Sequence, residues 1–262
     1  MQGDPRQLAA IGQEGRLTGM PTHATKQAVR ANVLSTSEFE EAIRECQPKL
    51  AVFDCDGTLW SGDAGSSFMS WSVEQGLLSQ QKIDWLMGRY SMYNRGELSE
   101  AGICGEMVQV YAGLREEQMH EAAKAFFEER IEALIFPEMR RLVANLQQSE
   151  CAIWAVSSTN RWAIEAGVRH FNLPPEGVLA AKVEVRDGVL TERVLDVPTD
   201  GGKVTALARK GVTQPDVVFG NSIHDAAMLA IAGRAFPVNP TEALVERSIE
   251  AGWKVYFPAS TR

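Results

Sequence analysis

The hydrophobic and polar positions divide the chain into an alternating helix and strand pattern, interrupted by one long helical stretch. A short apolar run at Leu50–Phe53 ends in acids and a glycine, which predicts a buried strand with a functional loop at its carboxyl end. Before it, Ser37 with Glu40 three residues later predicts a helix start, so we expect a helix over residues 38–46. Residues 1–34 show no sustained period, and we expect an N-terminal extension there.

Residues 64–135 keep a helical period throughout, with apolar side chains recurring at helical spacing. Breaks rich in glycine and polar residues, at 76–79, 94–96 and 112–113, divide this stretch into about four helices. The pattern therefore predicts an all-helical insert directly after the first strand.

After Pro137, which suits the first turn of a helix, strands and helices alternate as they do in α/β folds. Asp187 and Gly188 stand between two apolar runs, which predicts a β-hairpin. We expect an α/β core over residues 35–62 and 137–262, split by a helical cap over 63–136. The strands expected after Pro137 are Ala152–Val156, Val178–Val185, Val189–Val194, Val217–Phe219, Ala235–Val238 and Lys254–Phe257.

Composition and charge narrow the classes of function. The chain has 262 residues, 45% of them hydrophobic, which is enough for one large domain or a medium domain with an insert. Its formal charge of −8 repels polyanions, so we expect neither nucleic acid nor an anionic membrane as a partner. The four cysteines are far apart and suggest no zinc or redox motif. Without a signal-peptide pattern or a long apolar run, we expect a cytoplasmic protein.

The strongest chemical signal is the loop after the first strand, where Asp54 and Asp56 stand two residues apart before Gly57. Two carboxylates at the carboxyl end of one strand can face a single crevice, where open parallel sheets usually bind ligands. An EF-hand also alternates acids, but its glycine is the sixth loop residue, whereas Gly57 is the fourth here. A solvated acidic turn without function is the plainer alternative.

Three further segments follow in order, each at the expected end of a strand or start of a helix. Ser157 and Ser158 end an apolar strand, Lys203 stands in the first turn of a helix, and Asn221 and Asp225 follow another strand. Taken singly, each has an ordinary explanation: loop hydroxyls, a surface lysine, or an Asx turn that caps a helix.

Together, the Asp54-Cys55-Asp56-Gly57-Thr58-Leu59 motif and these segments resemble the haloacid dehalogenase-like hydrolase superfamily, in its phosphoserine-phosphatase-like branch, over about residues 38–262. The resemblance implies a Rossmann-like core with a helical cap of the C1 type. It also implies a Mg²⁺-dependent phosphatase that hydrolyses a small-molecule phosphate monoester. Asp54 would be the nucleophile that forms an aspartyl-phosphate, and Asp56 the general acid and base.

The resemblance also implies how phosphate and metal would be held. The Mg²⁺ ligands would be a side-chain oxygen of Asp54, the backbone carbonyl of Asp56, and Asn221 or Asp225. Position 221 is often aspartate in the superfamily, so the neutral amide predicts weaker metal affinity. The implied contacts to the phosphoryl oxygens are the residues Gly57, Thr58, Ser157, Ser158 and Lys203.

For the substrate, Asp63 falls where phosphoserine phosphatases have an acid that binds the substrate's ammonium group; a loop acid without a partner is the alternative. Met107 falls where the arginine for the substrate carboxylate is expected, which argues against phosphoserine unless Arg89 or Arg95 substitutes. An aromatic wall for an amine would come from Trp60, Tyr90 and Tyr93, with core packing as the alternative for any one of these aromatic residues. We therefore favour a small amino alcohol phosphate.

Two rival functions stay open at this point. A phosphotransferase or phosphomutase would use the same Asp54 and Asp56 and pass the phosphoryl group to another hydroxyl. A catalytically silent regulator would only bind a phospho-ligand, although the intact Asp54, Asp56 and Lys203 argue against it. A dehalogenase would not need Asp56 as an acid. For His224 we expect a packing role rather than acid–base chemistry.

Overall fold

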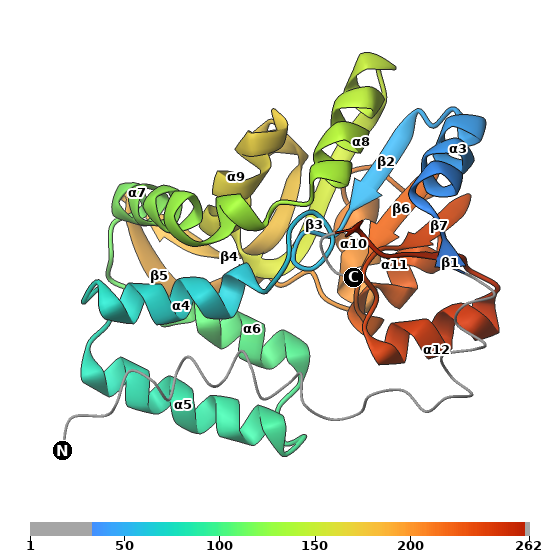
Figure 1. Cartoon of the computed structure of the whole chain (residues 1–262). Coiled ribbons are helices and arrows are strands. Elements are labelled where there is room, and N and C mark those ends of the chain that lie inside the picture. The colour runs from blue at the N-terminus through green and yellow to red at the C-terminus, as the bar shows by residue number, and fades with distance from the viewer. Residues whose placement is uncertain (1–32, 260–262) are drawn as a thin grey trace.

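A central six-stranded sheet organises the molecule, with the strand order β5-β4-β3-β2-β6-β7 (Figure 1). The computed structural model describes residues 33–259. Within them, β5 (Val189–Asp196) is antiparallel to its neighbour, and the other strands of the sheet are parallel. These are β2 (Leu50–Phe53), β3 (Ala152–Asn160), β4 (Val178–Arg186), β6 (Val217–Gly220) and β7 (Arg234–Pro237). The predicted α/β class, with a mostly parallel sheet, is confirmed.

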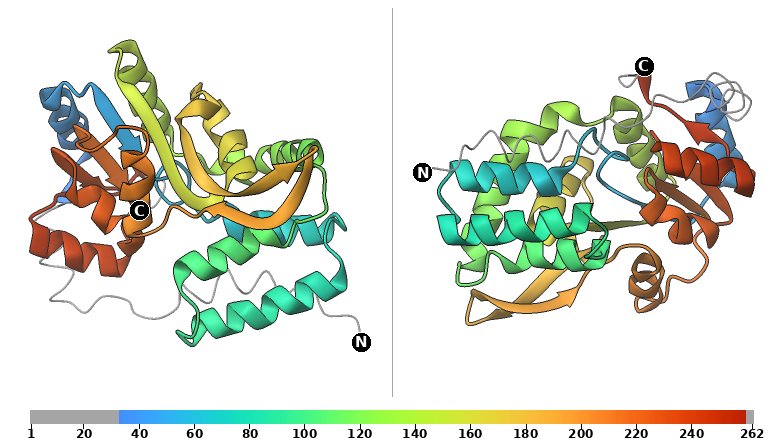
Figure 2. Two further views of the ribbon diagram at one scale, coloured as in Figure 1. Left: turned by 180° about the vertical axis from the view of Figure 1, so that it is seen from behind. Right: turned by 90° about the horizontal axis from the view of Figure 1, so that it is seen from below.

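The sheet is covered by helices on both faces, which explains why β2 is apolar at every position (Figure 2). Phe53 packs on one face, in a cluster with residues of α3 (Thr36–Cys46) and several other helices. Val52 points to the other face, in a cluster with three more helices. The remaining helices of the core are α8 (Pro137–Gln148), α9 (Arg161–Val168), α10 (Gly201–Ala208), α11 (Ala226–Ala230) and α12 (Glu242–Ala251).

Four helices lie between β2 and α8 in the chain, as the periodicity predicts. They are α4 (Ala64–Glu74), α5 (Gln80–Asn94), α6 (Glu100–Gln109) and α7 (Glu116–Phe126), and short helical turns follow at Phe127–Ile131 and Glu132–Leu134. Phe68 of α4 and Phe126 of α7 are buried in the same cluster as Trp162 of the core. Helices α4 and α7, and also α6 through Ile103 and Val108, are therefore packed on the core, and the assignment of 63–136 to a separate cap domain stays a prediction.

The hairpin of β4 and β5 extends this attachment. Its turn is formed by Asp187 and Gly188, both with positive φ (52° and 75°), as the sequence predicts. The segment between α6 and α7 pairs with the hairpin: the Gly113 amide donates to the Leu190 carbonyl at 2.9 Å, and the Leu190 amide donates to the Leu114 carbonyl at 2.9 Å. The helical insert is thus tied to the sheet by main-chain hydrogen bonds.

Two expectations near the N-terminus are wrong. Helix α3 begins after Ser35 instead of Ser37, because Ser35 has extended backbone and forms a reciprocal capping box with Glu38. Val33 and Leu34 form β1, which pairs with β8 (Val255–Tyr256), so they do not belong to an extension. The rest of the expected extension lies outside the described residues. Across residues 33–259, none of the helices is long and apolar enough to cross a membrane.

Candidate active site

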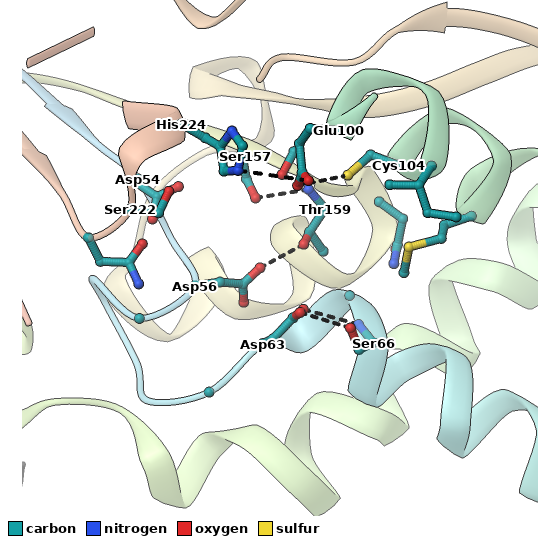
Figure 3. A pocket seen from close by; sticks show the side chains of 18 of the residues that line it. Asp54, Asp56, Asp63, Ser66, Glu100, Cys104, Ser157, Thr159, Ser222 and His224 are labelled. Atoms are coloured by element: carbon teal, nitrogen blue, oxygen red, sulfur yellow. Dashed lines mark hydrogen bonds and ion pairs between the residues drawn. The ribbon is translucent and has the colours of Figure 1, made fainter. Parts of the chain in front are cut away.

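The carboxyl ends of three parallel strands meet at one point of the sheet. Phe53, the last residue of β2, pairs with Ala155 of β3 and Phe219 of β6, and the Asp54 amide donates to the Phe219 carbonyl at 2.9 Å. A cavity of about 470 Å³ opens there, lined by these strand ends and by helices of the insert (Figure 3). Strand β3 runs on to Asn160, beyond the expected end at Val156, so the candidate residues Ser157 and Ser158 lie within the strand.

Asp54, Lys203 and Asp225 form one buried ionic cluster. The Lys203 ammonium donates to Asp54 Oδ1 at 2.7 Å, to Asp225 Oδ1 at 2.5 Å and to the Val156 carbonyl at 3.3 Å. The other oxygen of Asp225 accepts hydrogen bonds from the amides of Asn221 and Ser222, both at 2.9 Å. Lys203 thus fixes the orientation of Asp54, and Asp225 fixes that of Lys203.

The ionic cluster shifts the pKa values of both Asp54 and Lys203. Burial raises the pKa of Asp54 to about 7; the nearby Asp225 carboxylate adds to this rise, while Lys203 opposes it. Burial alone lowers the pKa of Lys203, but Asp225 and Asp54 outweigh it and raise that pKa above its ordinary value. The lysine therefore stays charged, and one cation faces several carboxylates.

Asp56 is held by three donors. Thr159 Oγ1 donates to Oδ2 at 2.6 Å (Figure 3). The Trp60 indole and the Ala64 amide donate to Oδ1 at 2.7 and 2.8 Å. Burial raises its pKa to about 6 and Asp63 adds to the rise, whereas the three hydrogen bonds oppose it. Thr159 and Trp60 are residues that the sequence analysis missed in this role, because neither belongs to the recognised motif positions.

The turn after Asp56 requires glycine. Gly57 has φ of +72°, and a Cβ there would lie 1.9 Å from Nδ2 of Asn221. Thr58 is buried, and its hydroxyl donates to Asp54 Oδ2 at 3.0 Å, while its amide donates to the Cys55 carbonyl at 3.1 Å. Thr58 therefore supports Asp54 in this structure, and its expected contact with phosphate stays a prediction.

The donors around Asp54 fit a hard divalent cation. Three carboxyl groups, from Asp54, Asp56 and Asp225, share the described site with one lysine, so acidic groups outnumber basic ones there. Within residues 33–259, no hydrogen bond of the Asn221 side-chain amide is found, and this amide lies against Gly57 beside the Asp56 main chain. The described residues contain no cluster of three His, Cys, Asp or Glu side chains placed to hold a metal, so backbone and amide oxygens would have to contribute.

The residues expected at the substrate end divide into two groups. Asp63, Tyr90, Tyr93 and Met107 line the cavity, as expected. Asp63 also caps α4, because its carboxylate accepts from the amide and the hydroxyl of Ser66 at 3.0 and 2.8 Å.

The other three expected residues lie outside the cavity lining. Trp60 is completely buried, which places its ring in the core and not in an aromatic wall. Arg89 is paired with both carboxylate oxygens of Glu106, and Arg95 with Glu97, so neither arginine replaces the missing carboxylate clamp.

His224 and Glu100 are two further residues that line the cavity. His224 Nδ1 is hydrogen-bonded to Asp200 Oδ1 at 2.8 Å, and its Nε2 lies 3.8 Å from Glu100 Oε2 of helix α6. His224 lines the cavity instead of being packed away from it, and Glu100 is a lining acid that the sequence analysis missed. No motif marks Glu100, since it comes from the start of an insert helix whose position only the fold reveals.

Comparisons with known proteins agree with this geometry. Residues 51–230 match the model of the family described as haloacid dehalogenase-like hydrolase. A search of curated protein sequences found no significant match.

Solved structures share the fold at low sequence identity. A protein of unknown function from Bordetella pertussis Tohama I is 23% identical, with a TM-score of 0.69 over 79% of this chain and 97% of that chain. A phosphoserine phosphohydrolase-like protein from Francisella tularensis subsp. tularensis SCHU S4 is 16% identical, with a TM-score of 0.55 over 79% and 94%. A substrate-bound phosphoserine phosphatase is 17% identical, with a TM-score of 0.54 over 80% and 93%.

Proposed function

We propose, from the premise that the chain belongs to the haloacid dehalogenase-like hydrolase family, that it is a Mg²⁺-dependent phosphatase of small phosphate monoesters. The observation that carries the proposal is a pair of carboxylates in one cavity, the buried Asp54 and the partly buried Asp56, with Asp54 held by Lys203 at 2.7 Å. The phosphoserine phosphatase among the structural neighbours supports the same chemistry.

In the first step, a carboxylate oxygen of Asp54 attacks phosphorus, and the bond from phosphorus to the leaving-group oxygen breaks. Asp56 donates a proton to that oxygen, so an alcohol leaves and an aspartyl-phosphate remains. In the second step, Asp56, now a carboxylate, takes a proton from water, which attacks phosphorus. The bond between phosphorus and Asp54 breaks, inorganic phosphate is released, and both side chains return to their starting states.

The surrounding residues would orient these groups. Thr58 and Lys203 fix the two oxygens of Asp54. The contact of Lys203 with the Val156 carbonyl, at 3.3 Å, is its longest, and it is the one that a phosphoryl oxygen can replace. Ser157 and Ser158 at the end of β3 and the amide of Gly57 would provide further donors.

The site would hold Mg²⁺ between a side-chain oxygen of Asp54, the main-chain carbonyl of Asp56 and the side-chain oxygen of Asn221. Both oxygens of Asp225 already have partners, so we assign Asp225 mainly to Lys203, with a direct metal contact as the lesser role. When bound, Mg²⁺ supplies positive charge that offsets the repulsion between the Asp54 carboxylate and the phosphate ester.

The test is p-nitrophenyl phosphate turnover with and without Mg²⁺, for the wild type and Asp54→Asn. We expect wild-type turnover only with Mg²⁺, and a loss of at least about a thousandfold in the variant, because an amide is not a competent nucleophile. Asp187→Asn is the matched control, since it makes the same change in a hairpin turn outside the cavity and should keep full activity.

The outcomes separate the parts of the proposal. Turnover that survives in Asp54→Asn would exclude Asp54 as the nucleophile, and turnover in a chelator would exclude the metal. Detection of a phosphorylated wild-type enzyme that hydroxylamine cleaves, and that the variant does not form, would establish the acyl phosphate.

A further inference from the structure

We infer, building on the proposed phosphatase function, that the cavity beyond Asp54 and Asp56 selects a leaving group with a positively charged amine and no carboxylate, and that Glu100 is the residue that selects it. Glu100 is the first residue of α6 and reaches the cavity from the insert, where it lies near His224 (Figure 3).

The charges along the cavity favour a cation. Among the described residues that line it, Lys203 is the only lysine or arginine, and its ammonium is bound by Asp54 and Asp225. Asp63 and Glu100 face the same cavity, and the pKa of Tyr90 is raised to about 12 by burial, with these two acids adding to the rise. A carboxylate on the leaving group would meet acids and no guanidinium, so it would be repelled.

Neighbouring donors hold the Glu100 side chain in place. Its carboxylate accepts a hydrogen bond from the Tyr93 hydroxyl at 2.5 Å and a long one from the Cys104 thiol at 3.5 Å, and its side chain is 19% exposed. The helix N-terminus also favours a negative charge at this position. His224 does not cancel it, because a protonated imidazole would still lie between two carboxylates, those of Glu100 and Asp200.

The walls of the cavity suit an alkyl ammonium group. The rings of Tyr90 and Tyr93 meet edge to face with centroids 5.8 Å apart, and both line the cavity, where a cation can contact an aromatic face. The apolar lining available to methylene groups comes from Met69, Ile103, Met107 and Val108. The volume, about 470 Å³, leaves space for a short amino alcohol ester.

The experiment compares matched pairs of substrates that differ only in charge. The pairs are 2-aminoethyl against 2-hydroxyethyl phosphate and 4-aminobutyl against 4-hydroxybutyl phosphate, with phosphoserine as the carboxylate-bearing probe. For the wild type we expect kcat/KM to favour the amine at least about tenfold in one pair, and to favour that amine over phosphoserine. In Glu100→Gln, which keeps size and loses charge, the amine preference should fall by on the order of tenfold. Because both substrates meet the same enzyme sample, the ratio does not depend on the fraction that is folded.

Glu97→Gln is the matched control. Glu97 lies three residues before Glu100, pairs with Arg95 at 2.7 Å and does not line the cavity, so its removal should leave the ratio unchanged. Glu100 is a sharper probe than Asp63, since Asp63 also caps α4 and its loss would disturb the helix.

Three results would overturn the inference. They are a wild type that turns over p-nitrophenyl phosphate without amine preference in either pair, a preference for phosphoserine, and a Glu100→Gln variant whose rates fall equally on amine and hydroxyl esters. The last result would make Glu100 only a structural partner of Tyr93 and His224. Each of them is distinct from failure of the phosphatase proposal, in which p-nitrophenyl phosphate itself is not hydrolysed.

Discussion

Replacing Thr159 by valine removes one of the three donors that hold Asp56 and leaves the other two in place. The Thr159 hydroxyl is largely buried and lies 2.6 Å from Asp56 Oδ2, a short bond of the charge-assisted kind. Hydrogen bonds to charged groups contribute about 1.5–3 kcal/mol. At about 1.36 kcal/mol for each factor of ten, their loss corresponds to roughly 10- to 150-fold in an equilibrium or rate.

The effect should appear in the pH dependence of the reaction. The hydrogen bond from Thr159 favours the carboxylate form of Asp56 and so lowers its pKa; without it, that pKa rises above its value of about 6. The proposed second step needs Asp56 as a carboxylate to accept a proton from water. We therefore expect the acidic limb of the kcat profile, measured at saturating Mg²⁺, to move upward by at least about one pH unit. At pH 6 the variant should lose about tenfold in kcat, and much less near pH 8.

The matched control is Thr191→Val on the hairpin, outside the cavity, whose hydroxyl donates to Glu184 at 3.4 Å and accepts from the Arg193 amide at 3.2 Å. Its profile should coincide with that of the wild type. A Thr159→Val profile that also coincides would refute the assignment of Thr159 as the residue that positions Asp56. A loss that is equal at every pH would mean that the substitution damages packing and not the protonation of Asp56.

Two further predictions concern the turn and the metal. Gly57→Ala should destabilise the fold by more than the roughly 1–2 kcal/mol of a left-handed backbone alone, because the new Cβ would overlap Asn221. The control is Gly76→Ala, since Gly76 has a similar φ of +70° and no neighbour within 4 Å. Equal denaturant midpoints for the two variants would contradict this reasoning. Asn221→Asp should lower the Mg²⁺ concentration needed for half-maximal activity by on the order of tenfold, because a carboxylate replaces a neutral ligand. Unchanged or weaker Mg²⁺ dependence in that variant would remove Asn221 from the metal site.

The fold was predictable where the chain repeats a simple period. Local sequence patterns predict three features that the structure contains: the apolar strand β2, the four insert helices and the Asp187-Gly188 turn. The start of α3 was not predictable in the same way, because Ser35 and Ser37 both stand three residues before a glutamate. Which serine caps the helix depends on the pairing of β1 with β8. That pairing joins opposite ends of the described chain, and no local pattern encodes it.

Of the residues in the site, only those that belong to the sequence motifs could be predicted. Asp54, Lys203 and Asp225 come together as the order of strands implied, since parallel strands deliver their carboxyl ends to one edge. Thr159 and Glu100 were missed for different reasons. Thr159 looks like an ordinary strand residue until β3 is seen to run beside Asp56, and Glu100 looks like an ordinary acid in the first turn of a helix.

Acidic groups outnumber basic ones at two separate places in the cavity, around Asp54 and around Glu100, and experiments can distinguish the effects of the two. Around Asp54, three carboxylates face one lysine, so the protein alone is short of cations where any phosphate ester would react. Around Glu100, positive charge is lacking in the part of the cavity that we assign to the leaving group. Removing Mg²⁺ should therefore slow all esters alike, whereas removing the Glu100 charge should change only the preference among them. An amine preference that disappears on lowering Mg²⁺ would contradict this separation, because it would mean that a single pool of negative charge serves both ends.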